Sequence, residues 1–146
     1  MTVASLCGPT CGTEFFVHVL GAVTLFGGVL AVTVLAFAAL RLAPERAQLV
    51  RRMGFWTTLV LMVPAWVVMY FGGYWLLGHE GLDTQTPEWA DAGITIASIG
   101  AGITIGLLIL GWLAINRPRV GGWVAALATL YLIALGVAWF YMSAKP

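Results

Sequence analysis

Four long stretches of apolar residues dominate this chain and limit what it can fold into. They run over about 15–40, 55–77, 92–115 and 122–142, and none has an Asp, Glu, Lys or Arg in its interior. A helix of about 20 apolar residues crosses the roughly 30 Å hydrocarbon core of a bilayer. Strands are disfavoured because the stretches are long and do not alternate apolar with polar residues. The sequence therefore predicts an all-α fold, a transmembrane four-helix bundle that forms one membrane domain over residues 1–146.

The composition agrees with a lipid environment. Apolar residues make up 61% of the 146 residues and charged residues 9%, whereas a soluble domain has about 25% charged residues. A soluble domain of this size buries only about 70% of its unfolded surface, which is too little to hide so much apolar area. The bilayer is therefore the expected partner, and the net charge of +1 gives no electrostatic case for nucleic acid.

Charge is divided unevenly among the loops. Loop 41–53 holds four arginines and loop 116–121 holds two. The connection between the second and third spans has acids and no Lys or Arg: Glu80, Asp83, Glu88 and Asp91. Cytoplasmic loops carry the excess of Lys and Arg, so we expect both basic loops in the cytoplasm and both termini outside. Six arginines against one lysine, with abundant Ala, Gly, Val and Leu, favour a GC-rich bacterial gene and hence the bacterial inner membrane.

Small residues recur at helical spacing along the spans. Helices in lipid associate through close packing of small residues. The predicted packing positions are Gly21, Gly28, Ser98, Gly102 and Gly106. A polar pathway for an ion is the alternative interpretation of the stripe in the third span.

A proline interrupts the second span. Pro64 lies near its middle and has no backbone N–H, so the residue predicts a kink. A hinge or a cavity beside the kink is one interpretation, and ordinary membrane-helix geometry is the other.

Two histidines offer the main candidate chemistry. His18 lies about one turn inside the first span and His79 at the outer end of the second, where two imidazoles can hold a b-type haem or one metal ion. The alternative is a solvated His79 and a neutral His18 bonded to water or a carbonyl. Cys7, Cys11, Glu14 and His18 can also ligate copper or zinc, although a disulfide or free thiols come first for the two cysteines. No catalytic set accompanies these residues.

Two segments resemble a known family. Residues 16–22, FVHVLGA, and 26–28, FGG, look like the first helix of DUF2269-type small bacterial membrane proteins. Residues 55–56, 64–69 and 73–75 are similar to their second helix. The resemblance implies a four-helix membrane protein of unassigned activity.

That family resembles in turn the copper-resistance D-like and HemJ-like four-helix proteins. In HemJ-like proteins a first-helix His ligates haem, and His18 matches that position. Those proteins also use a Lys in the third helix, which residues 92–115 lack.

These observations favour an accessory or interaction subunit without enzymatic activity, bound to other membrane subunits or to copies of itself. The first alternative is a b-type haem or metal-binding membrane protein that uses His18 in redox chemistry or haem metabolism. The second is a small oligomeric channel or transporter. Any site is expected near the outer ends of the first three helices.

Overall fold

The structure is a computed structural model that describes residues 12–79, 81 and 88–143. Its elements are α2 (Thr13–Arg41), α3 (Pro44–Thr57), the π-helical segment η2 (Thr58–Met62), α4 (Val63–His79), α5 (Glu88–Asn116), the 3-10 turn η3 (Pro118–Val120) and α6 (Gly121–Ser143). Within these ranges there is no strand, and four helices are long and apolar enough to cross a membrane. The predicted all-α membrane fold is confirmed.

The helix that holds the second predicted span is longer than the span itself. It continues from Pro44 to His79, 36 residues, through α3, η2 and α4. Pro44 stands at its first turn, where a missing N–H leaves no bond unmade. The basic stretch that precedes the apolar residues is thus part of the same helix.

The π-helical segment lies just before Pro64. In a regular α-helix the proline ring clashes with the carbonyl four residues earlier, here that of Val60, which lies inside η2. A π turn shifts this register by one residue. The hydroxyl of buried Thr58 donates to the Gly54 carbonyl at 3.0 Å, within the preceding turn.

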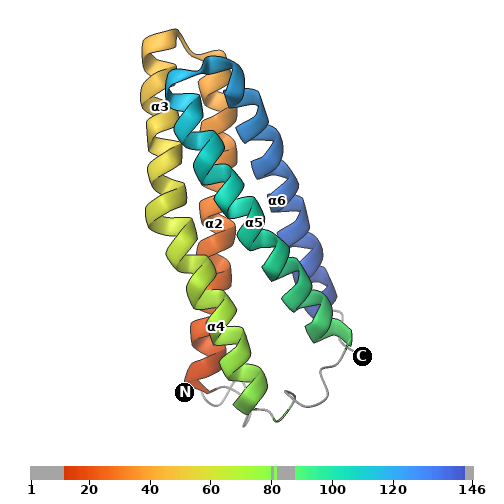
Figure 1. Ribbon diagram of the computed structural model, residues 1–146. Coiled ribbons are helices and arrows are strands. Elements are labelled where there is room, and N and C mark those ends of the chain that lie inside the picture. Colours follow the sequence, from red (N-terminus) through yellow and green to blue (C-terminus); the bar gives the residue numbers. More distant parts are fainter. Residues whose placement is uncertain (1–11, 80, 82–87, 144–146) are drawn as a thin grey trace.

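The bundle is built around α2. This helix packs against α4, α6 and α3, and α5 packs against α6 and α3, whereas α4 and α5 make few contacts (Figure 1). The core includes Leu25, Val29, Met62, Leu107 and Tyr131. Figure 1 shows that α4 and α5 separate toward the end at which α2 begins.

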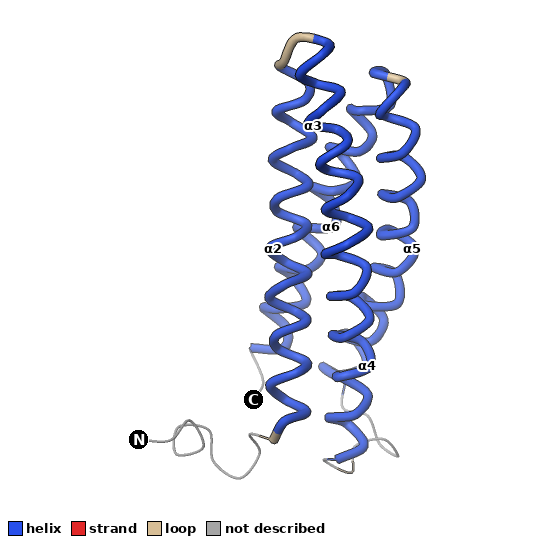
Figure 2. Tube along the Cα trace, turned by 90° about the vertical axis from the view of Figure 1, so that its left-hand side faces the viewer, coloured by secondary structure: helices blue, strands red, loops and turns tan. Residues whose placement is uncertain are grey.

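The two ends of the bundle differ in charge. At one end α2 meets α3 and α5 meets η3, and we call it the basic end (Figure 1). It carries six arginines: Arg41, Arg46, Arg51, Arg52, Arg117 and Arg119. At the opposite end α2 begins and α6 ends (Figure 2), and we call it the acidic end because the first turns of α2 and α5 hold Glu14, Glu88 and Asp91. Both basic loops therefore share one end, as the predicted orientation requires, and the side of the membrane that it faces stays a prediction.

The seam between α2 and α4 uses glycines. A Cβ on Gly21 would lie 2.5 Å from the backbone nitrogen of Met69, and one on Gly28 would lie 2.8 Å from Cγ of Met62. On α4, Gly72 faces the backbone of His18 in the same way, at 3.1 Å. The two helices thus approach through positions that have no side chain.

The seam between α5 and α6 lies on a different face of α5 from the predicted one. Gly102 is exposed and has open space around its Cβ position, and exposed Ser98 donates to the Ile94 carbonyl of its own helix. Gly100 is buried instead, since its Cβ would lie 2.6 Å from the hydroxyl of Tyr131. The small size of the α5 residues did not by itself predict which of them would face the large side chain of Tyr131.

Gly106 lies at the border of this seam. A Cβ there would lie 3.3 Å from Cδ2 of Leu127 on α6. Of the predicted third-span positions, Gly106 thus approaches α6, and Ser98 lies within hydrogen-bond reach of Tyr70 on α4.

Candidate functional site

His18 is held between α2 and α4 near the acidic end. Its Nδ1 lies 2.8 Å from the Met69 carbonyl oxygen. The ring lies against Gly73, whose Cβ would be 3.1 Å from Nδ1 and Cε1. Glycine at position 73 therefore makes room for the imidazole, and the Met69 carbonyl fixes its orientation.

This contact also fixes where the proton of a neutral His18 ring resides. A carbonyl oxygen only accepts, so Nδ1 must donate and Nε2 keeps its lone pair. Metal-ligating histidines share this pattern, because their second nitrogen donates to a carbonyl or a carboxylate. His18 is thus prepared for one ligand bond through Nε2, and equally for a simple helix-to-helix hydrogen bond.

His79 does not join His18 but lies beside Glu14. Its Nδ1 is 3.9 Å from Oε1 of Glu14, with the imidazole side chain 71% exposed and the carboxylate side chain 13% exposed. Glu14 and His18 are four residues apart on α2 and share a face. The contact links the start of α2 to the end of α4.

The proposed copper or zinc ligands are only partly covered by the structure. Cys7 and Cys11 lie outside the described residues. Within the described ranges no three His, Cys, Asp or Glu side chains gather closely enough to hold a metal ion.

A ladder of aromatic residues on α4, absent from the sequence predictions, lies next to this region. Trp66 stacks on Tyr70 at 4.8 Å between ring centroids, and Tyr70 meets Tyr74 edge-on at 5.0 Å. The Tyr70 and Tyr74 hydroxyl oxygens are 3.4 Å apart. The spacing of four residues along one helix face was the available sequence signal.

Trp66 ties this ladder to α5. Its indole Nε1 donates to the Ala97 carbonyl at 2.9 Å. Toward the end at which α2 begins, α4 and α5 separate, as Figure 1 shows. Exposed Ser98 follows Ala97 on α5. The acidic half of the bundle thus offers tyrosine and serine hydroxyls at a lipid-facing boundary between two helices.

Fold and sequence together define a polytopic helical membrane protein. The chain belongs to the DUF2269 family: the sequence model of that family, described as a predicted integral membrane protein, matches residues 15–101. This range covers more than half of the chain, from α2 into α5. The resemblance seen in the first two spans is thereby confirmed, and the likeness to copper-resistance D-like and HemJ-like proteins stays a prediction. No curated protein and no solved structure matches the chain.

Proposed function

We propose that this protein is a non-enzymatic accessory or interaction subunit of the bacterial inner membrane. In this proposal it binds a transmembrane helix, of another subunit or of a second copy, through the outward face of α5. The observation that carries the proposal is the open space at Gly102.

The outward face of α5 has the composition of a helix-packing surface. Ser98, Gly102, Ile105 and Ile109 are all exposed and follow one another at spacings of four, three and four residues. In lipid, small residues allow two backbones to approach, and hydroxyls bond across the interface. A helix face that contacts only lipid does not require small residues, because large aliphatic residues suit lipid tails just as well as small ones do. The glycine at the middle of this face therefore favours a docked helix over lipid tails.

Photocrosslinking in native membranes tests this proposal. A photoreactive residue at Ile105 of α5, which is 57% exposed, is compared with one at Ile133 of α6, which is 60% exposed. We expect Ile105 to give a discrete protein adduct, identified by mass, and Ile133 to give lipid adducts. Gly102→Leu should abolish the adduct, whereas Gly136→Leu, at an equally open position on α6, should preserve it. Lipid adducts alone at Ile105 would overturn the proposal.

A second candidate function is haem binding through His18. The bond from His18 Nδ1 to the Met69 carbonyl supports it, because it leaves Nε2 available. A haem would supply one-electron redox chemistry. The second ligand is less well provided, since His79 lies beside Glu14.

Absorption spectra of the detergent-purified protein separate the two candidates. A Soret band that disappears in His18→Ala would establish haem and remove the purely accessory function. A spectrum without visible bands, from protein purified after growth with a haem precursor, would end the haem hypothesis.

A further inference from the structure

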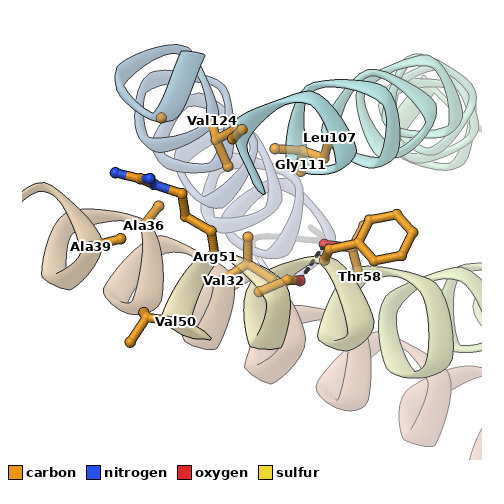
Figure 3. Close-up of a pocket in the computed structure, with 13 residues that line it drawn as sticks. Val32, Ala36, Ala39, Val50, Arg51, Thr58, Leu107, Gly111 and Val124 are labelled. Carbon is orange, nitrogen blue, oxygen red and sulfur yellow. Dashed lines mark hydrogen bonds between the residues drawn. The ribbon is translucent and has the colours of Figure 1, made fainter. Parts of the chain in front are cut away.

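Arg51 lies at the basic end of the bundle with its side chain partly buried. Figure 3 shows it extending from α3 between α2, near Ala36 and Ala39, and the start of α6, near Val124. It borders a cavity of about 20 Å³ with mainly small and apolar lining. Its Nε is buried and has no hydrogen-bond partner among the described residues.

The surroundings leave the charge of Arg51 uncompensated. An Arg side chain stays protonated in proteins, and a buried donor without a partner is costly. One water molecule fits the cavity and can accept from Nε, but it brings no negative charge. Of the charged residues at this end, Glu45 is the single acid beside six arginines. No carboxylate of the described part of the chain forms an ion pair with Arg51.

Aromatic residues place Arg51 at the depth of the lipid headgroups. Trp56, Trp112 and Trp123 are exposed near the same end, and the ring of Phe55 packs against Trp112 with centroids 5.4 Å apart. Belts of tryptophan lie at the membrane–water interface. Arg51 precedes Phe55 by about one helical turn, so its guanidinium lies on the water side of this belt.

We propose that the basic end binds the phosphate of an anionic phospholipid headgroup, and that Arg51 is its specific ligand. The guanidinium offers a planar set of donors that matches phosphate oxygens. Basic recesses between membrane helices bind anionic headgroups in this way. The exposed arginines of the basic end add a general electrostatic attraction to the anionic headgroup, and this attraction depends little on their exact positions.

A matched pair of variants distinguishes this site from general attraction. Arg51→Gln and Arg52→Gln remove the same charge from neighbouring residues, but Arg52 is exposed whereas Arg51 is partly buried. Native mass spectrometry would measure phosphatidylglycerol and phosphatidylcholine retained by the full chain in detergent. We expect the wild type to prefer phosphatidylglycerol, and Arg51→Gln to weaken its binding about tenfold. Arg52→Gln should change the binding by less than about twofold.

Three outcomes would overturn the proposal. Equal retention of the two lipids by the wild type would do so without any variant. Equal losses in the two variants would show a diffuse surface. Complete displacement of phosphatidylglycerol by millimolar inorganic phosphate would show a site for a soluble anion. If Arg51→Gln does not fold, Arg51→Lys serves instead, because it keeps the charge but removes the planar donor set; it should weaken binding by an intermediate factor, and unchanged binding would refute the specific role.

Discussion

Replacing Gly21 with alanine tests the close approach of α2 and α4 directly. The added Cβ would lie 2.5 Å from the nitrogen and 2.8 Å from the Cα of Met69, whereas ordinary contacts begin at 3.4 Å. These are backbone atoms, so α4 must move away by about 1 Å. Overpacking of this kind costs about 1–3 kcal/mol.

The same movement should break a second interaction. The Met69 carbonyl accepts from His18 Nδ1 at 2.8 Å, and an added 1 Å or so takes the pair beyond hydrogen-bond range. An interhelical hydrogen bond in a membrane contributes about 0.6 kcal/mol on average. We therefore expect Gly21→Ala to lose about 2–4 kcal/mol relative to a glycine with open surroundings.

Gly27→Ala is the matched control, because no other described element comes within 4 Å of its Cβ position. It undergoes the same change in helix propensity without the clash. Gly28→Ala should fall between the two, since its Cβ meets the flexible side chain of Met62. Reversible unfolding in mixed micelles, followed by circular dichroism, would measure all three. Equal stabilities of Gly21→Ala and Gly27→Ala, to within about 0.5 kcal/mol, would refute the packing described for this seam.

Three further experiments follow from the structure. Gly100→Ala should destabilise the protein by about 1–3 kcal/mol in the same unfolding assay, because its Cβ would lie 2.6 Å from the hydroxyl of buried Tyr131; an unchanged stability would contradict the α5–α6 contact. Trp66→Phe removes the 2.9 Å bond to the Ala97 carbonyl and should cost about 0.6 kcal/mol while widening the distance between spin labels on α4 and α5; an unaltered distance would contradict the proposed link. Gln48→Cys, in a chain without its native cysteines, should resist an impermeant maleimide added to intact cells and react after lysis, because Gln48 lies on α3 at the basic end, which is expected in the cytoplasm; labelling in intact cells would reverse the orientation.

The membrane helices were predictable because their cause is local. Each span owes its length to the absence of charge over about 20 residues, and prolines such as Pro44 and Pro118 stand in the first turn of a helical segment. The grouping of arginines at one end followed from the same reasoning, since four spans place alternate loops together. These features depend on neighbours in the sequence rather than on partners in space.

The seams were predictable only in part, because they depend on the helix opposite. Gly21 meets α4, whereas no other described element comes within 4 Å of the Cβ position of Gly102. Both belong to similar stripes of small residues. The deciding factor for α5 is the large side chain of Tyr131, which requires Gly100 opposite it. Such pairings join residues more than thirty positions apart, and hydropathy patterns hold no information about them.

The candidate site also combines features that the sequence predicts with features that only the fold shows. His18 was singled out because an ionisable residue inside a span is rare, but its contact with Met69 could not be read from the sequence. The pairing of Glu14 with His79 joins the ends of two helices and depends on how those helices are rotated. The aromatic ladder of Trp66, Tyr70 and Tyr74 was visible as a spacing of four residues, yet its position beside the gap between α4 and α5 required the fold.

The π-helical segment Thr58–Met62 has a consequence for both ends of the bundle. An extra residue in one turn changes the angular phase of everything after it by about 100°, the rotation per residue of an α-helix. Before the segment, the Arg51 side chain borders the cavity at the basic end. After the segment, the Trp66 indole donates to the Ala97 carbonyl of α5. In a regular α-helix of the same sequence, Arg51 and Trp66 could not both point toward the helices that they contact here. Converting the segment to regular α-helix without removing a residue would therefore turn α4 against α3 and uncouple the two ends, while leaving the hydropathy of the span unchanged.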